Sequence, residues 1–486
     1  MIHLSTIDVL LIGLYFAAVL ATGFVAGRRT GGGDVLEYLL AGRSLTVPLF
    51  VMTLVSTWYG GILGVGEFSY RYGISNWVIQ GVPYYIFALV FAVLLAKRIR
   101  ATNLTTIPDM LEHAYDRRTA LLGAGLTFLL MTPAPYVLML GVLLQMLTGW
   151  QPAVCVIAGT LVTTVYLLTG GFRSDVYTDV LEFFLMFLGF GIIIPFAVSQ
   201  YGGWAFLTAH LPAQHLTWDG GNSLQFVLVW FFIALWTLVD PSFHQRCYAA
   251  KSGAVAQRGI LWSIVFWIVF DAMTATAGLY ARAILPDLEQ PLMAYPQLAE
   301  VILPSAAKGL FVIGLLATIM STLNTLAFVS ATTLGRDIVW RMLQGREGGQ
   351  TKTGERGRGE EAMWVRIGLI VSGVLAVVLA LVIPSVIRLW YTIGTVIVPG
   401  LLVPLVTAYF KRVRVNARWA FASMCSGWLV SLAWLLAGWF REPGVAVFYP
   451  LGIEPMYPGL GVSVLVWCGG MAALRGAKSG AEVNSV

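Results

Sequence analysis

Apolar residues occur along this chain in long runs that are separated by short polar connections. About 13 of these runs approach the roughly 20 residues that a helix needs to cross the hydrocarbon core of a bilayer. The runs lie near 7–27, 47–69, 75–96, 120–147, 152–170, 177–200, 223–243, 259–281, 309–335, 363–385, 389–410, 417–440 and 458–474. The pattern predicts an all-α polytopic membrane protein with about 13 transmembrane helices.

Composition supports this interpretation. Of the 486 residues, 58% are hydrophobic and only 11% are charged, which excludes a soluble or disordered chain. The formal net charge of +6 suggests nucleic acid as a partner only if the basic residues form one surface. The distribution of Lys and Arg along the chain instead indicates the orientation of the helices in the membrane.

Lysine and arginine alternate from one connection to the next. The N-terminal flank "MIHLSTID" lacks the basic residues of a signal peptide, so the first run is interpreted as a retained helix with its N-terminus outside. With that orientation, 25 of the 30 Lys and Arg residues fall in cytoplasmic connections or the C-terminal tail. We therefore expect a multi-pass protein of the cell (inner or plasma) membrane with a cytoplasmic C-terminus. Its partner is the lipid bilayer; no nucleic acid and no obligate protein partner is indicated.

Two apolar runs are interrupted at matching places. Gly60, Gly61, Gly64 and Gly66 cluster in the second run, and Asp240-Pro241 lies near the inner end of the seventh. Without the first run, these are the first of five runs each, which points to an inverted-repeat transporter with broken helices. Glycine is also common where membrane helices pack closely.

The expected organisation is one transmembrane transporter domain over 1–486. It consists of an extra N-terminal helix at 7–27, repeat A at 46–201, repeat B at 223–410 and two C-terminal helices at 415–475. The polar stretch "GREGGQTKTGERGRGEE" at 345–361 is expected to be a mobile cytoplasmic loop.

The ninth run carries a cluster of hydroxyl side chains. In "GLLATIMSTLNTLAF" (314–328), helical spacing puts four of them on one face, with Asn324 at its edge. The four are Thr318, Ser321, Thr322 and Thr325. Such hydroxyls bond back to carbonyls one turn earlier or ease helix packing. Alternatively they form an ion site, since a hard cation such as Na⁺ prefers oxygen ligands.

Acidic residues within the membrane are the other functional candidates. Asp179 and Glu182 share one side at the start of the sixth run, and Asp271 lies well inside the eighth. Intramembrane acids are costly and mark ion or proton pathways. A proton-coupled carrier or channel-like permease using Asp179 or Asp271 is therefore an alternative function. A polytopic membrane enzyme is disfavoured because the five histidines show no metal-ligand spacing.

Several motifs together resemble the sodium:solute symporter family, which contains sodium–glucose, sodium–proline and sodium–sialic acid cotransporters. The resemblance covers about residues 8 to 412. It rests on "EYLLAGRSL" (37–45), "TIPDMLEHAYDRR" (106–118), "GGFRSDVYTDVLE" (170–182), "HQRCYAAKS" (244–252) and "STLNTLAFVSATTLGRDI" (321–338). It implies a leucine-transporter-type fold of five plus five inverted helices with extra helices at both ends. It also implies uptake of a small organic solute by alternating access, coupled to inward sodium flux.

The resemblance also implies sodium ligands. The family's sodium site would use the backbone carbonyls of Ser56, Tyr59 and Thr318 and the hydroxyls of Ser321 and Thr322. Some members have a second sodium site, which here would involve Asp179 and Ser321 with Asn324 or Thr325.

Departures from the family pattern bear on the substrate. Trp58 and Gly60 stand where the sodium–proline type has an aspartate and a serine, and Ile233 and Trp236 stand where the sugar symporter has polar and tyrosine groups. The candidate substrate residues are Thr57, Trp58, Tyr136, Phe232, Ile233 and Trp236, whose aromatic members either line a cavity or pack in the bundle. No Lys or Arg is expected in mid-membrane, so a carboxylate substrate would have to bind at a half-helix N-terminus.

Overall fold

A computed structural model describes residues 3–28, 35–346, 355–383, 386–439 and 449–483. Across these residues the chain is helical, and its β pairing is limited to one isolated bridge between Leu45 and Ala250. Eleven helices of the described chain are long and apolar enough to cross a membrane. A twelfth span consists of α3 (Val47–Trp58) and α4 (Ile62–Tyr72), which meet at a bend of 59°. The remaining expected run is the shorter apolar segment Pro152–Val165.

The first half of the chain ends with a long bent helix, α10 (Pro152–Tyr201). It bends at Gly171, whose φ of 56° lies in the left-handed region, so it supplies two of the expected runs. The other elements of this half are α1 (Thr6–Arg28), α2 (Val35–Leu40), η1 (Ala41–Arg43), η2 (Trp77–Gly81), α5 (Val82–Phe91), η3 (Ala92–Ala96), α6 (Lys97–Ala101), α7 (Ile107–Ala114), α8 (Arg117–Leu130) and α9 (Ala134–Thr148).

The second half contains the longest uninterrupted apolar helices. Its elements are α11 (Trp204–His210), η4 (Ala213–Leu216), α12 (Leu224–Ile233), α13 (Trp236–Val239), α14 (Pro241–Ala249), α15 (Gly253–Ile284), η5 (Pro291–Met293), α16 (Ala294–Ile302), α17 (Ala307–Thr332), η6 (Thr333–Trp340), α18 (Arg341–Arg346), α19 (Glu355–Val382), α20 (Val386–Ala408), α21 (Ala417–Trp439), η7 (Pro450–Gly452) and α22 (Met456–Val483).

In the order of elements, α1 precedes two sets of spans, and α21 and α22 follow them. Residues 347–354 of the expected cytoplasmic loop lie outside the described residues. Helix α19 begins at Glu355, so 355–361, which we expected to belong to that loop, is helical. The loop prediction is therefore too long at both ends, because Gly345 and Arg346 belong to α18 and the seven residues "ERGRGEE" belong to the apolar helix that follows them.

The first span of each set is broken, as the glycine and proline signals predicted. In the first set, α3 ends at Trp58 and α4 begins at Ile62. In the second, Asp240 has an extended backbone with ψ of 115°, and its side chain caps α14 by accepting from the amides of Ser242 and Phe243. Pro241 takes the first helical position, where its missing N–H costs nothing.

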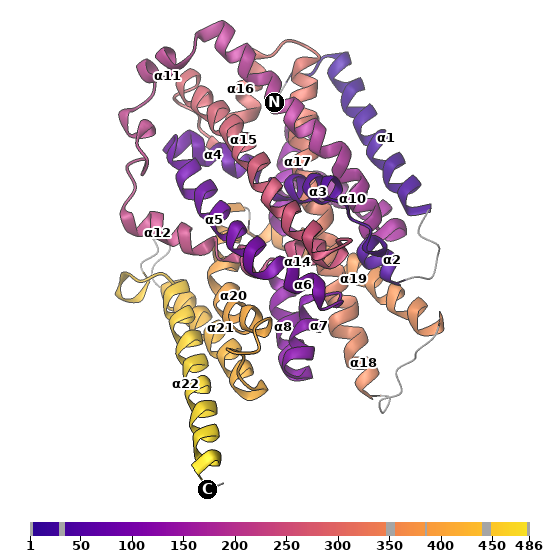
Figure 1. Cartoon of the computed structure of the whole chain (residues 1–486). Helices are drawn as coiled ribbons and strands as arrows, with labels where there is room; N and C mark the ends of the chain where they lie inside the picture. Colours follow the sequence, from indigo (N-terminus) through magenta and orange to yellow (C-terminus); the bar gives the residue numbers. More distant parts are fainter. Residues whose placement is uncertain (1–2, 29–34, 347–354, 384–385, 440–448, 484–486) are drawn as a thin grey trace.

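Helix α17 lies at the centre of the molecule (Figure 1). Every residue from Phe311 to Thr332 is buried. Gly314 of α17 meets Gly189 of α10 so closely that a Cβ on Gly189 would lie 2.9 Å from the Gly314 Cα. The hydroxyls of α17 therefore need hydrogen-bond partners within the protein: Thr318 donates to the carbonyls of Gly314 and Leu315 one turn earlier, whereas Ser321, Thr322 and Thr325 donate to neighbouring helices.

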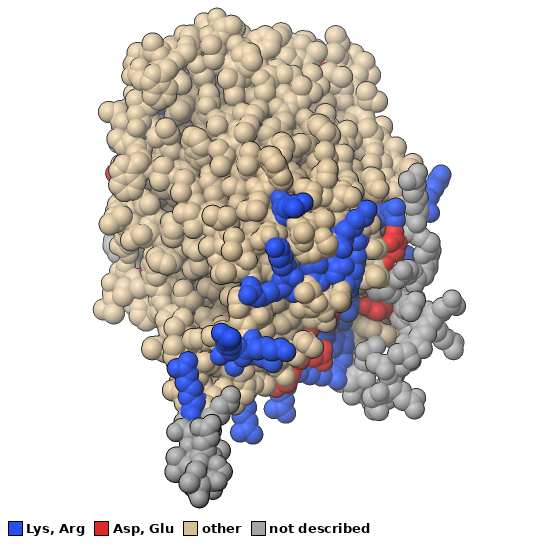
Figure 2. Space-filling view, in the orientation of Figure 1, with Lys and Arg blue, Asp and Glu red and all other residues tan. Residues whose placement is uncertain are grey.

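The two chain ends lie at opposite ends of the helix bundle (Figure 1). Figure 2 shows Lys and Arg gathered toward the end that carries the C-terminus, with little charge over the rest of the visible face. The Lys and Arg residues that occur in alternate connections of the sequence therefore gather at one end of the helix bundle.

Candidate functional site

The last turn of α3 presents backbone carbonyls to α17. Because α3 ends at Trp58, the carbonyls of its last turn lack amide partners within that helix. The Thr57 carbonyl accepts a hydrogen bond from the Thr322 hydroxyl, with Thr322 Oγ1 2.5 Å from Thr57 O. Gly60 permits this approach, since a Cβ there would lie 2.2 Å from Thr322 Oγ1. The break in the span therefore brings α3 and α17 together through oxygen atoms.

Four of the five predicted sodium ligands lie at or beside this contact. Thr322 Oγ1 is also 3.3 Å from the Thr318 carbonyl oxygen. Ser56 belongs to the last turn of α3, and Tyr59 follows it at the C-cap. The carbonyl in direct contact with α17 is that of Thr57, which the prediction did not name as an ion ligand.

The fifth predicted ligand, Ser321, points toward a different helix. Its hydroxyl donates to Asp179 Oδ1 at 2.6 Å, and the Thr325 hydroxyl donates to Asp175 Oδ2 at 2.7 Å. Both carboxylates belong to α10 and are fully buried. The hydroxyl face of α17 thus divides between the α3 break and the acidic side of α10.

A buried arginine lies between these groups. The Arg246 guanidinium is fully buried, and its Nη2 is 2.6 Å from Thr57 Oγ1, 3.3 Å from Asp179 Oδ2 and 3.1 Å from Thr325 Oγ1. The expectation that no Lys or Arg lies within the membrane is therefore wrong. Arg246 was assigned to a cytoplasmic connection, but all nine residues of α14 are buried and extend the seventh span to Ala249. The carboxylates provide the charge that makes this burial tolerable.

The residues expected at a second sodium site surround this arginine. Asp179 and Thr325 both contact Arg246, and Ser321 contacts Asp179. Asn324 does not join them: neither its amide oxygen nor its nitrogen has a hydrogen-bond partner among the described residues, although both atoms are buried.

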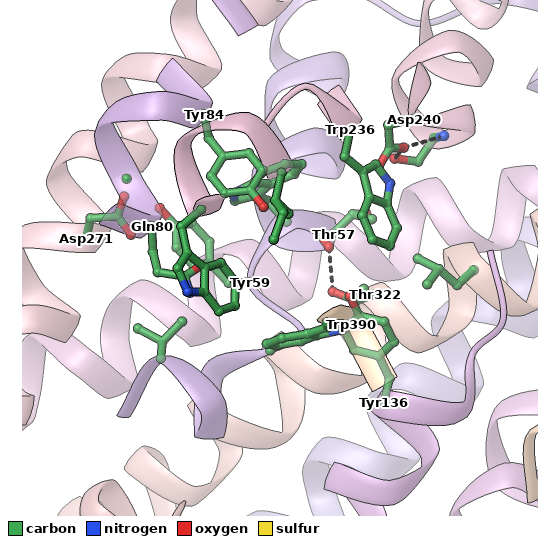
Figure 3. Close-up of a pocket in the computed structure, with 18 of the residues that line it drawn as sticks. Thr57, Tyr59, Gln80, Tyr84, Tyr136, Trp236, Asp240, Asp271, Thr322 and Trp390 are labelled. Atoms are coloured by element: carbon green, nitrogen blue, oxygen red, sulfur yellow. Dashed lines mark hydrogen bonds between the residues drawn. The ribbon is translucent and has the colours of Figure 1, made fainter. Parts of the chain in front are cut away.

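A cavity adjoins the contact between α3 and α17 (Figure 3). It encloses about 1070 Å³ of atom-free space, including its open mouth, and Thr57, Tyr59 and Thr322 belong to its wall. Five of the six predicted substrate residues line it, namely Thr57, Trp58, Tyr136, Ile233 and Trp236. The sixth, Phe232, is not among the residues that line the cavity; its ring packs against Tyr457 instead, with ring centroids 5.7 Å apart. Phe232 belongs to the same helix as Ile233, but its ring is directed away from the cavity.

Several cavity residues were not assigned there from the sequence. These are Asn76, Trp77, Gln80, Tyr84, Trp230, Asp240, Asp271 and Trp390. Asp271 was recognised as an intramembrane acid that a proton-coupled carrier could use, and Asp240 as part of a helix break. The tryptophans and tyrosines carried no signal in the sequence, because aromatic residues are frequent throughout it and only packing selects those that face the cavity.

A cluster of ion pairs joins α7 to η6 and α18 at the basic end of the molecule. Asp109 Oδ1 is 3.0 Å from Arg336 Nη1 and 2.6 Å from Arg341 Nη2. Burial alone would raise the pKa of Asp109, but the two guanidinium groups outweigh it and hold the pKa well below its usual range. Asp109 therefore stays charged and fixes the connection at 106–118 to the helix that follows α17.

Comparison with known proteins agrees with this architecture. The profile described as "Sodium:solute symporter family" matches residues 38–427. A high-affinity choline transporter from Drosophila melanogaster is 26% identical over 92% of this chain and 72% of its own length. A sodium/pantothenate symporter from Escherichia coli is 26% identical over 67% of this chain and 70% of its own length.

Among solved structures, a Na⁺-coupled sialic acid symporter in a substrate-bound outward-open state superimposes with a TM-score of 0.76. The alignment covers 96% of this chain and 97% of that one at 16% identity, so it bears on the fold alone. The predicted fold class is confirmed: this is an all-helical polytopic membrane protein with the leucine-transporter-type arrangement.

Proposed function

Because this chain belongs to the sodium:solute symporter family and is a sodium-coupled secondary transporter, not an enzyme, we propose that its sodium ion binds between the last turn of α3 and the hydroxyl face of α17. The ligands would be the carbonyls of Ser56, Tyr59 and Thr318 and the hydroxyls of Ser321 and Thr322, joined by the Thr57 carbonyl. The ion is cargo that enters and leaves in each cycle.

One observation carries this proposal: the 2.5 Å approach of Thr322 Oγ1 to Thr57 O. It places the hydroxyl of one helix against the carbonyl end of another, so that the two oxygen atoms can face one ion. Oxygen atoms of this kind suit a hard cation. The set is neutral, so it would bind a monovalent ion weakly enough to release it on the other side.

Ser321 fits this set although it donates its proton to Asp179. A hydroxyl that donates a hydrogen bond keeps lone pairs that an ion can use. The adjacent carboxylate orients the hydroxyl and adds negative charge close to the ion, and Arg246 balances that charge from the opposite side. The pair formed by Asp179 and Thr325 already holds a positive guanidinium, so our proposal rests on one ion.

Alternating access follows from the position of the two helices. An ion bound to both α3 and α17 favours the state in which they are together, and separation of the helices removes ligands and releases it. The cavity shares Thr57, Tyr59 and Thr322 with the ion site, so the ion and solute stabilise one arrangement. A coupling free energy of about 1–3 kcal/mol is sufficient, and the membrane potential adds about 2.3 kcal/mol per charge per 100 mV.

Orientation in the membrane is proposed from charge. The Lys- and Arg-rich end that carries the C-terminus is placed in the cytoplasm of the cell membrane, and the N-terminus outside (Figure 2). The transported solute is proposed to be a small organic molecule. The names of the relatives differ in substrate, choline for one and pantothenate for the other, so the solute has to be inferred from this chain's own cavity.

The test is a sodium-dependent change in thermal stability of the purified protein. We expect the melting temperature to rise with sodium chloride and not with equal concentrations of potassium chloride, because an ion that binds only the folded state stabilises it. An identical response to the two salts would contradict the proposed site, and proton-driven uptake through Asp179 or Asp271 would then be preferred.

A further inference from the structure

We propose that the solute is a small organic cation, bound in the aromatic cavity with its positive charge toward Asp271. This inference rests on the proposed function and adds the chemical class of the solute. It derives from the composition of the cavity wall, where eight of the 21 lining residues are Trp or Tyr and the charged members are Asp240 and Asp271 alone. No Lys, Arg or His of the described chain belongs to this wall.

Five different membrane spans supply rings to the cavity. Trp58 of α3 meets Tyr84 of α5 with ring centroids 4.9 Å apart, and Tyr136 of α9 meets Trp390 of α20 at 6.0 Å. Trp236 comes from α13, which lies between the end of α12 at Ile233 and the break at Asp240. Figure 3 shows Tyr84, Trp236, Tyr136 and Trp390 around one space, with Asp271 and Asp240 toward opposite sides of it. Aromatic faces attract cations, most strongly when the cation is desolvated.

Asp271 is the acidic group best placed to take the charge of the solute. It lies inside α15 within a membrane span, is partly exposed to the cavity, and takes part in no salt bridge among the described residues. Tyr85 donates a hydrogen bond to its Oδ2, and Trp77 donates in turn to the Tyr85 hydroxyl at 3.0 Å. These donors hold the Asp271 carboxyl group in place, and neither of them is a cation. A carboxyl group at membrane depth without a cation partner marks a functional site, and together with the aromatic wall it suits a cationic ligand.

The half-helix N-termini of α14 and α4, which adjoin the cavity, are both contacted by side chains of the chain itself. Asp240 Oδ1 already accepts from the amide of Ser242 at 2.7 Å and so occupies the N-terminus of α14. At the N-terminus of α4, the Trp390 ring covers Gly61, where a Cβ would lie 2.0 Å from Trp390 Cη2. A carboxylate solute bound at one of these two helix ends would therefore have to displace the Asp240 carboxyl group or the Trp390 ring.

Arg246 does not alter this charge balance at the solute. It lies behind Thr57, to which it donates at 2.6 Å, and it is not part of the cavity wall. Its charge is taken up by Asp179 and Asp175, at 3.3 Å and 4.0 Å. The cavity therefore retains an overall negative character.

The experiment uses the purified full chain in sodium chloride and measures the melting temperature with a panel of probes. Choline and tetramethylammonium are the cations, acetate and pantothenate are the anions, and proline is the zwitterion. The neutral probes are glucose and the uncharged analogue of choline in which carbon replaces the quaternary nitrogen. We expect stabilisation by the cations only, and a weaker choline response when potassium replaces sodium. The carbon analogue separates charge from shape.

Two variants assign the binding to the cavity. Asp271→Asn should weaken choline binding about tenfold or more, because it removes the countercharge while keeping a polar group of similar shape. Asp287→Asn, an exposed acid outside the cavity, is its matched control. Trp236→Leu should weaken binding and Trp236→Phe should restore part of it, since a ring returns. In each variant the sodium-induced rise shows that the protein is folded.

The outcomes separate the two proposals. A sodium response with no stabilisation by either cation overturns the cationic solute and leaves the sodium site standing. The same conclusion follows if glucose, proline or an anion stabilises better than choline, or if Asp271→Asn leaves choline affinity unchanged. If sodium does not raise the melting temperature of the unmodified protein, the proposed sodium site is contradicted instead.

Discussion

Thr322 and Thr57 are 265 positions apart in the chain, yet the hydroxyl oxygen of one lies 2.5 Å from the carbonyl oxygen of the other. This contact joins the third span of the second set to the break in the first span of the first set. The cavity and the candidate ion site therefore share these two residues, since both Thr57 and Thr322 also line the cavity.

Replacing Thr322 by alanine should weaken sodium binding. The change removes one oxygen of the proposed ligand set and leaves the Thr57 carbonyl without its donor, a loss on the order of 1–3 kcal/mol or roughly tenfold or more in affinity. The measurement is the sodium concentration at half-maximal rise in melting temperature. Ser330→Ala is the control, because Ser330 is buried on the same helix and its hydroxyl has no partner among the described residues. Equal midpoints for the two variants would remove Thr322 from the site.

Gly60→Ala should abolish the sodium response and sodium-driven uptake. A Cβ at residue 60 would lie 2.2 Å from both the Cβ and the Oγ1 of Thr322, so α17 could not approach the break. Gly125→Ala in α8 is the matched control, because a Cβ there meets no atom within 4 Å. We expect the control to keep wild-type stability or gain slightly, since alanine favours a helix over glycine. Normal transport by Gly60→Ala would show that the close approach is not needed.

Arg246→Gln should strongly destabilise the folded protein. Removing one partner of a buried ion pair typically costs about 3–5 kcal/mol, because the remaining charge stays buried without compensation. Adding Asp179→Asn should recover part of that loss, giving a double-mutant coupling of about 0.5–3 kcal/mol. Thermal unfolding of the four proteins in one detergent measures it. Strictly additive effects of the two substitutions would mean that Arg246 and Asp179 do not stabilise each other.

The connection between α10 and α12, residues 202–223, should lose stability as the pH falls. His215 is 2% exposed, with Nε2 3.0 Å from the Tyr70 carbonyl oxygen. Burial lowers its pKa from the usual 6.5; the Tyr70 carbonyl acts in the opposite direction and Arg282 reinforces the lowering. The unfolded chain therefore takes up the proton first, so stability is complete above pH 6.5 and declines as the pH falls from there toward the pKa of the folded state.

His215→Gln tests the source of this dependence. We expect the slope of melting temperature against pH below pH 6.5 to flatten in this variant. His210→Gln, an exposed histidine on the same connection, should keep the slope of the unmodified protein. An unchanged slope in His215→Gln would assign the pH dependence to other groups.

The sequence alone determined the membrane class, the positions of the spans and the broken helices. Apolar runs of bilayer length, with 25 of the 30 Lys and Arg residues in alternate connections or the C-terminal tail, permit few other arrangements. Gly60-Gly61 and Asp240-Pro241 identified the breaks because these residues disfavour an uninterrupted helix. The hydroxyl face of α17 was likewise readable, since helical periodicity fixes which of its residues point the same way.

Tertiary structure decided what those groups meet. Ser321 and Thr322 are neighbours in sequence, yet one contacts Asp179 on α10 and the other contacts Thr57 on α3. Arg246 follows a helix break and looked like part of a basic loop, but packing of α14 buries it beside two carboxylates. Phe232 and Ile233 are adjacent on one apolar helix, and only Ile233 faces the cavity. Local pattern specifies a helix and its polar side, whereas the neighbour across each side depends on contacts between residues far apart in the chain, which no local pattern encodes.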